Sequence, residues 1–198
     1  MIKLGRFKSF ITKMYSDIKN FSQKDTDFIQ MRLPVFNITE DFENNLKDKI
    51  KDSLINAEIR EATREDIDHL IDLHDRAWHS TPMPYRPLTK EKIINMLIDE
   101  SIIFLIAKVE GEDSGFALIY FTSKDNLVGV IAGLGILPEL QRKGLGTILG
   151  MASWDLFKKK GVKELRCKVY KDNKASYSFI RGLGFEEYDE DFVTWKLF

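Results

Sequence analysis

The sequence predicts an α/β fold, in which strands and helices share one sheet-based domain. Strand-like runs alternate along the chain with helix-length amphipathic stretches, and one glycine-rich turn joins a strand to a helix. Composition agrees, because 43% hydrophobic and 12% aromatic residues in a chain of 198 supply enough apolar surface for a core. Disorder along the whole chain is thereby excluded. We expect one main domain with an appendage, since domains usually contain about 100 to 200 residues.

Overall charge gives no reason to expect a nucleic-acid partner. The chain contains 30 Lys plus Arg and 31 Asp plus Glu, so it carries no global basic field. The single cysteine, Cys167, excludes an internal disulfide and leaves no cysteine cluster for a metal. The longest apolar run, Val128 to Leu137, is shorter than the ~20 residues that a membrane span needs. We therefore expect a cytoplasmic protein with no membrane span.

The first residues of the chain predict an amphipathic helix. Apolar side chains recur there at three- and four-residue spacing, at Ile2, Leu4, Phe7, Phe10, Ile11, Met14, Tyr15, Ile18 and Phe21. Up to Lys24 the segment has six basic residues and only Asp17 as an acid, so binding at a membrane surface is one interpretation. We favour docking of the apolar stripe on the main domain or on a second copy, which would give a homodimer.

The segment from Asp25 to Asp52 is interpreted as a connector with one short helix, because its pattern weakens into polar and charged residues. Residues 1–56 then form an N-terminal helical extension and connector, and residues 57–198 form the main domain.

Regular elements follow in order through the main domain. Thr63 is a helix cap, three prolines from Pro82 to Pro87 interrupt the chain between two helices, and Gly161 ends a helix. The expected elements are strand Glu58–Ala62, a helix from Thr63 through Trp78, helix Thr89–Ile98, strands Ile102–Val109, Gly115–Thr122 and Val128–Leu137, helix Leu145–Lys160, strand Val162–Tyr170, helix Asn173–Leu183 and two short strands within Phe185–Phe198.

The turn between Gly133 and Thr147 suits a phosphate group. Gly144 and Gly146 let a ligand approach the backbone, and the free amides of the following helix point towards it with the positive end of the helix dipole. Arg142 and Lys143 add positive charge. The spacing matches neither the dinucleotide fingerprint nor the Gly-Lys-Ser/Thr loop of nucleotide hydrolases. The alternative is a glycine-bearing helix entry that binds no ligand.

The pattern Gln141-x-x-Gly144-x-Gly146 after a strand and Pro138, followed by Asn173 and Gly184-Phe185, resembles the acetyl-CoA-binding core of the GNAT N-acetyltransferase superfamily. The resemblance covers residues 58–198 and includes the order of strands and helices. It implies a mixed, mostly antiparallel, twisted sheet whose central parallel strands splay apart, with helices on its faces. It also implies acetyl-CoA as cosubstrate and an amine, in a small molecule or a protein, as acceptor.

The same resemblance implies which residues hold the cofactor. Leu134, Gly135 and Ile136 pair by backbone with the pantetheine arm, which acts as a substitute strand. Backbone amides hold the pyrophosphate, in a set made of Arg142, Lys143, Gly144, Leu145, Gly146 and Thr147. Asn173 meets the arm from the far side, and the alternative for its side chain is a helix N-cap.

The residues that handle protons in this family are missing from the chain. A tyrosine that many members carry seven residues after the Asn is Ile180 here, and two family glutamates fall at Val130 and Lys168. Tyr170 is our candidate catalytic residue, because alternation along its strand puts it on the face of Lys168. A solvent-exposed tyrosine is the alternative. Cys167 points to the opposite face and is interpreted as a core residue.

The histidines predict no metal site. His69, His74 and His79 are five residues apart, which scatters their side chains around a helix. His79 is a candidate for acceptor contact all the same, because it lies with Trp78, Tyr85 and Arg86 around the proline-bearing loop, which borders the acceptor groove in the family. A stiff exposed loop is the alternative.

Two functions remain open from the sequence. The first is an enzyme that transfers acetyl from acetyl-CoA to a primary amine by direct attack. The second is a non-catalytic module that binds CoA or an acyl-CoA and acts in protein interaction or regulation. Transfer of a longer acyl chain is a variant of the first.

Overall fold

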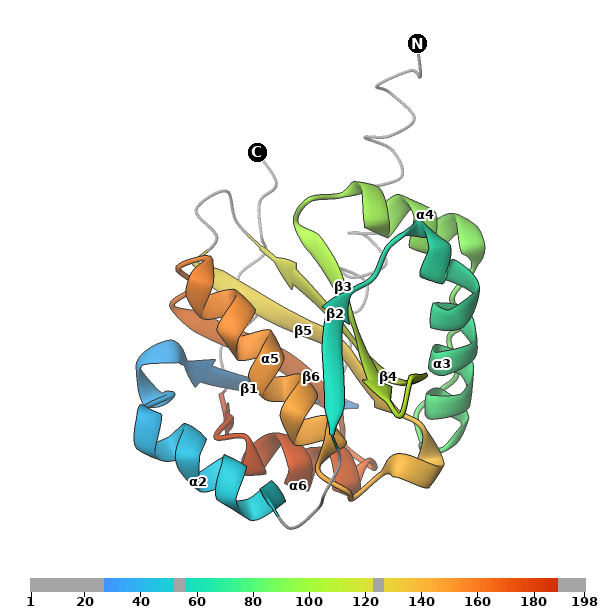
Figure 1. The fold of residues 1–198 in the computed structure, drawn as a ribbon. Coiled ribbons are helices and arrows are strands. Elements are labelled where there is room, and N and C mark those ends of the chain that lie inside the picture. Colours follow the sequence, from blue (N-terminus) through green and yellow to red (C-terminus); the bar gives the residue numbers. More distant parts are fainter. Residues whose placement is uncertain (1–26, 52–55, 123–126, 189–198) are drawn as a thin grey trace.

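The computed structural model describes residues 27–51, 56–122 and 127–188. Its centre is a seven-stranded sheet with the order β2-β3-β4-β5-β6-β1-β7 (Figure 1). The strands are β1 (Phe28–Pro34), β2 (Ala57–Glu61), β3 (Ile102–Val109), β4 (Glu112–Phe121), β5 (Val128–Ile136), β6 (Glu164–Tyr170) and β7 (Glu186–Glu187). All neighbouring pairs are antiparallel except β5 and β6, which are parallel. The mixed, mostly antiparallel sheet expected from the sequence is therefore confirmed.

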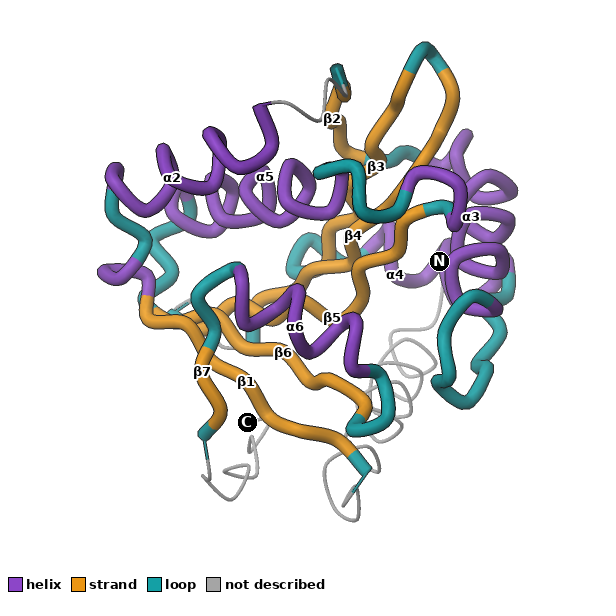
Figure 2. Tube along the Cα trace, turned by 90° about the horizontal axis from the view of Figure 1, so that it is seen from below, coloured by secondary structure: helices purple, strands orange, loops and turns teal. Residues whose placement is uncertain are grey.

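Helices cover both faces of the sheet. The longer ones are α2 (Glu40–Lys51), α3 (Ile67–His79), α4 (Lys90–Ile98), α5 (Leu145–Lys159) and α6 (Lys174–Gly182). Helices α3 and α4 pack on strands β3 to β5 around Leu73, Ile93 and Phe116, whereas α5 crosses the other face and α2 runs beside it (Figures 1 and 2). Among the described helices, none combines the length and the apolar character needed to cross a membrane.

The segment from Asp25 to Asp52 contains the helix that we expected there, the 12-residue α2, but its description as a connector is wrong, because strand β1 also occupies it. Strand β1 lies between β6 and β7, inside the sheet of the domain that we expected to begin at residue 57. The alternation of polar and buried residues along β1 is short: Gln30 and Arg32 alternate with Met31 and Leu33, which are buried in the core. The partner strand β6 is far away in the sequence, so no local pattern announced the pairing. The helix expected from Ile2 to Phe21 lies outside the described residues.

Local signals placed most other elements correctly. The Thr63 hydroxyl accepts from the amide of Glu65 at 3.3 Å, and the Asp66 carboxylate accepts from the amide of Thr63 at 2.7 Å, which completes a capping box. Thr89 caps α4, and Gly161 has a positive φ of 77° just after α5. Of the two strands expected between Phe185 and Phe198, the structure shows the short β7, and residues 189–198 lie outside the described part.

If β1 is a core strand, Met31→Ala should destabilise the protein strongly. Met31 is 0% exposed, and truncating a buried methionine typically costs about 2 to 5 kcal/mol of unfolding free energy. Phe36 lies five residues further on and is 81% exposed, so Phe36→Ala is a matched control that should change the unfolding free energy by less than about 0.5 kcal/mol. Urea denaturation measures both. Equal effects would contradict the placement of β1 in the core.

Candidate functional site

Strands β5 and β6 separate halfway along their length. Their parallel register runs from Val128 opposite Glu164 to Ile131 opposite Cys167 and ends there. Among the described strands, β5 pairs beyond this point with β4 alone, and β6 with β1 alone. The register between β4 and β5 also shifts here, which leaves Ala132 as an extra residue between Ile131 and Gly133. Because a bulge bends its strand, it directs β5 away from β6, and the splay expected from the sequence is confirmed.

A cleft opens where the two strands part. It contains about 750 Å³ of empty space, its open mouth included. The lining residues come from helix α3 and its following loop, strands β4 to β6 and helix α6: Ala77, Trp78, Thr81, Met83, Phe116, Ile131, Ala132, Gly133, Leu134, Gly135, Cys167, Lys168, Val169, Tyr170, Asn173, Ser176, Phe179 and Ile180. Of the sequence-predicted residues, Leu134, Gly135, Tyr170 and Asn173 therefore meet in one cleft.

The glycine-rich turn leads from the end of β5 into α5. Arg142 and Gly144 both have positive φ, 58° and 86°, and Gly144 is the N-cap of α5. The first helical bond is donated by the amide of Ile148 to the carbonyl of Gly144 at 3.1 Å. The amides of Leu145, Gly146 and Thr147 precede it and have no acceptor within the helix. No acidic side chain lies in this first turn, so the positive end of the helix dipole is not neutralised there.

Helix α5 lies close to α6 at Gly146. A Cβ atom at this position would come within 3.2 Å of the Phe179 ring, so a larger residue would require the ring to shift by a few tenths of an ångström. Phe179 also lines the cleft. The predicted phosphate loop and the cleft are therefore neighbouring parts of one site. Ile136, also predicted to bind the cofactor, is 8% exposed and does not line the cleft itself.

The two polar atoms of the Asn173 side chain differ in their hydrogen bonding. Its Oδ1 accepts from the amide of Ser176 at 3.0 Å, which makes Asn173 the N-cap of α6 and confirms that alternative. Its Nδ2 is buried in the cleft and has no hydrogen-bond partner among the described residues. A buried donor without an acceptor is costly, so this nitrogen is suited to an acceptor supplied by a ligand.

Three of the described cleft residues carry titratable side chains: Cys167, Lys168 and Tyr170. Cys167 is 6% exposed, and burial raises the pKa of its thiol far above the usual value, so it stays protonated and inert, as expected for a core residue. The Tyr170 ring meets the edge of Phe28 at 5.4 Å between centroids. Ile180, at the position of the missing tyrosine, lines the cleft and is 6% exposed.

Sequence reasoning missed Ser176. It lines the cleft one helical turn before Ile180 and one turn after Asn173, so the spacing of these two residues along α6 was the available signal. Tyr177 is absent from the lining, and its hydroxyl donates to Glu187 at 2.5 Å.

The loop after α3 forms the wall of the cleft opposite α6. Trp78, Thr81 and Met83 line it, and the Trp78 indole Nε1 donates to the carbonyl of Pro84 at 3.0 Å. The Tyr85 hydroxyl donates to Asp75 at 2.5 Å. We call Trp78, Thr81 and Met83 the acceptor-side wall. Of the four residues expected around the acceptor groove, only Trp78 lines the cleft; the other three, His79, Tyr85 and Arg86, do not.

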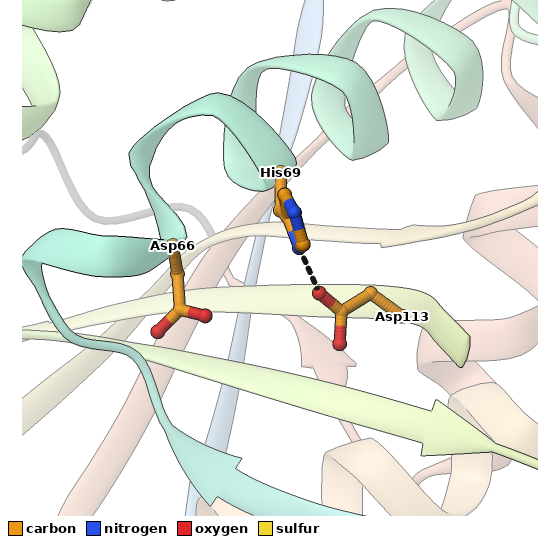
Figure 3. A group of neighbouring side chains, drawn as sticks. All are labelled: Asp66, His69 and Asp113. Carbon is orange, nitrogen blue, oxygen red and sulfur yellow. Dashed lines mark hydrogen bonds and ion pairs between the residues drawn. The ribbon is translucent and has the colours of Figure 1, made fainter. Parts of the chain in front are cut away.

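A group of potential metal ligands lies away from the cleft. Asp66, His69 and Asp113 offer ligand atoms within 4.8 Å of one another, and Figure 3 shows His69 of α3 pointing at Asp113 of β4. Their Nδ1 and Oδ2 atoms are 2.7 Å apart. Asp66 is already bound by Arg60 through two bonds of 2.7 and 2.9 Å, and Asp113 has the Nζ of Lys108 at 3.8 Å. We interpret the group as an ion-pair network that ties β2, α3 and β4 together.

Comparison with known proteins agrees with this geometry. The family model described as "Acetyltransferase (GNAT) family" matches residues 67–185, which is more than half of the 198-residue chain. The chain belongs to the GNAT acetyltransferase family. Acetyl-CoA is the cosubstrate of this family, and related structures contain coenzyme A.

Individual relatives differ in how much of each chain they cover. A spermidine N(1)-acetyltransferase of Thermoplasma acidophilum is 28% identical over 68% of this GNAT chain and 91% of its own. A mycothiol acetyltransferase of Renibacterium salmoninarum is 39% identical over 64 residues, so the match spans 32% of this chain and only 19% of that protein. A PaiA N-acetyltransferase of Thermoplasma acidophilum, solved with coenzyme A, superposes with a TM-score of 0.62 and 25% identity over 70% of this chain and 94% of its own.

His74, which packs against the acceptor-side wall, is expected to make the free energy of unfolding depend on pH. It is 4% exposed, its ring lies 4.8 Å from that of Trp78, and desolvation lowers its pKa below the ordinary value of 6.5. The neutral ring is therefore preferred in the folded state. The unfolded chain binds a proton first as the pH falls below about 6.5, so the free energy of unfolding should fall from there towards the folded-state pKa.

We expect His74→Phe to reduce this loss, because phenylalanine keeps an aromatic ring against Trp78 and cannot be protonated. The measurement is the melting temperature of both proteins between about pH 8 and pH 5. Parallel curves would show that His74 does not cause the acid sensitivity.

Proposed function

We propose that this protein is an acetyl-CoA-dependent N-acetyltransferase that transfers acetyl to a primary amine of a small molecule or a protein. The observation that carries the proposal is the cleft between β5 and β6, which joins a phosphate-type helix entry to an aromatic wall. In such a cleft a linear cofactor can bind from the side of the helix entry, and an acceptor can approach it from the side of the aromatic wall.

The chain's own residues fit coenzyme A. Leu134, Gly135 and Ile136 lie beyond the last pair with β6, so their strand presents an edge that an extended pantetheine arm can follow. Asn173 lines the same cleft, and its buried Nδ2 lacks an acceptor in the described part. Arg142, Lys143 and the amides of Gly144, Leu145, Gly146 and Thr147 are suited to the pyrophosphate.

The reaction places modest demands on the protein. Acetyl-CoA supplies an acetyl group activated as a thioester, and a neutral amine can attack it directly. The inert Cys167 thiol supports direct transfer over a covalent acetyl-enzyme. Since Ile180 cannot donate a proton, Tyr170 is the residue in the lining that we assign to proton transfer or hydrogen bonding at the reacting centre. Positioning in the cleft supplies the rest of the rate.

The relatives support an amine acceptor without naming the one used here. The Thermoplasma acidophilum relative is named for spermidine, so spermidine belongs in any first panel of acceptors. Peptides with a free N-terminus and lysine-containing peptides complete the panel. Release of free CoA with any of these amines supports the enzyme, whereas CoA binding without any release favours the alternative, a non-catalytic binding module.

Coenzyme A should raise the melting temperature of the wild-type protein. A ligand present at 100 times its Kd adds about 2.7 kcal/mol to the unfolding free energy. Gly144→Glu should abolish the shift, because it places bulk and negative charge at the predicted pyrophosphate site. Its φ of 86° also strains any larger residue, so Lys143→Glu serves as a second variant that reverses a charge without that strain. No shift of the wild-type protein at millimolar CoA would overturn the cofactor assignment.

Tyr170→Phe should lower kcat and leave the affinity for CoA unchanged, since it removes the hydroxyl and keeps the ring against Phe28. We expect a decrease of about 100-fold or more if the hydroxyl acts as a general acid. Ile180→Tyr is the companion variant and should raise kcat if departure of the thiolate limits the rate. Steady-state kinetics with a confirmed amine measure both. Unchanged kcat in both variants would leave catalysis to positioning alone.

A further inference from the structure

One side chain connects the cofactor loop to the acceptor-side wall. The Nε2 of Gln141 donates to the carbonyl of Ile136 at 3.1 Å and to the hydroxyl of Ser80 at 3.0 Å. Ile136 ends strand β5, and Gln141 lies just before the loop residues Arg142 to Gly144. An amide nitrogen has two protons, so both of these bonds form at the same time.

Ser80 lies between Gln141 and the acceptor-side wall and forms hydrogen bonds at the end of α3. It is the C-cap of α3, and its hydroxyl donates to the carbonyl of Ala77 at 2.7 Å, which leaves the oxygen to accept from Gln141. Thr81 follows directly; its hydroxyl donates to the carbonyl of Trp78 at 2.9 Å and accepts from the amide of Met83 at 3.3 Å. The backbone amide of Ser80 donates to the carbonyl of Trp78, which also accepts from the Thr81 hydroxyl, so Ser80 joins the bond from Gln141 to the bonds of the acceptor-side wall.

We infer that Ser80 is a positioning residue that holds the acceptor-side wall in register with the cofactor loop through Gln141. The inference rests on the proposed function, because it assumes that the loop binds coenzyme A. Coupling between two sites is reciprocal, so ordering the loop with CoA should also order the wall and the residues behind it.

A second contact between the same elements offers a matched control. Arg76 of α3 donates to Glu139 at 2.6 Å, and these side chains are 47% and 55% exposed. An ion pair as exposed as this contributes little, because water and salt screen it. Glu139→Gln breaks the ion pair and leaves the Ser80 contact intact, so it separates general loosening of α3 from the effect of Ser80.

The experiment uses coenzyme A alone as the probe and needs no acceptor. Hydrogen–deuterium exchange is followed at the amides of Tyr85, Arg86, Leu88 and Thr89, because these residues belong to the loop but do not line the cleft. In the wild-type protein CoA should slow their exchange. Ser80→Ala should remove this protection and weaken CoA binding by about two- to fivefold, the range for an exposed hydrogen bond. Ser80→Thr keeps a hydroxyl and should restore both, and Glu139→Gln should resemble the wild type.

The outcomes separate the two proposals. If the wild-type protein does not bind CoA in a titration, the proposed function fails and this inference falls with it. If CoA binds but Ser80→Ala keeps full protection of the loop, the inference is wrong and the proposed function stands. Equal losses in Ser80→Ala and Ser80→Thr, or in Glu139→Gln, would also overturn it, because the hydroxyl of Ser80 would then not be the cause.

Discussion

The separation of β5 from β6 after Ile131 and Cys167 is the constraint on which the rest of the site depends. Every buried backbone amide and carbonyl needs a hydrogen-bond partner, and strands satisfy this need through their neighbours. On one side β5 pairs with β4 from Gly129 to Ile136 except at the bulged Ala132, but on the other side its pairing with β6 ends after four residue pairs. The extra residue Ala132 redirects the strand at that point, and the open edge that results is suited to an extended ligand.

Each face of the sheet then contributes one half of the site. The face covered by α5 and α6 holds the glycine-rich turn, Asn173 and Ile180, and the face covered by α3 holds Trp78 and Phe116. Because the strands part, the two halves meet through the sheet. The described lining of the cleft contains no carboxylate, so a carboxylate base of the kind found elsewhere in the family has no counterpart there. Under the proposed function, Tyr170 and the geometry of approach would assist the reaction.

Strand β1 supports this arrangement from the N-terminal side. It pairs with β6 along seven residues and places Phe28 opposite Tyr170, where the two rings meet edge to face. Arg32 of β1 also forms a 3.1 Å ion pair with Glu186 of β7. A segment that reads as a connector in the sequence is thus a neighbour of the candidate catalytic residue. Its burial at Met31 and Leu33 makes it part of the core.

The sequence by itself determined the elements whose ends depend on local chemistry. Thr63 and Thr89 start helices, Gly144 and Asn173 stand at helix N-caps, and Cys167 and Tyr170 lie on opposite faces of one strand, all as expected. These features follow from bonds and spacings within a few residues, so a linear pattern contains them.

Only the tertiary structure decided the features that depend on residues far apart in the chain. These features are the pairing of β1 with β6, the bulge at Ala132, and the hydrogen bond between Ser80 and Gln141, which are sixty-one residues apart. The orphaned Nδ2 of Asn173 likewise became visible only when the packing around it was known. The physical reason is that pairing, burial and hydrogen-bond satisfaction are set by the fold as a whole, and no short stretch of sequence encodes them alone.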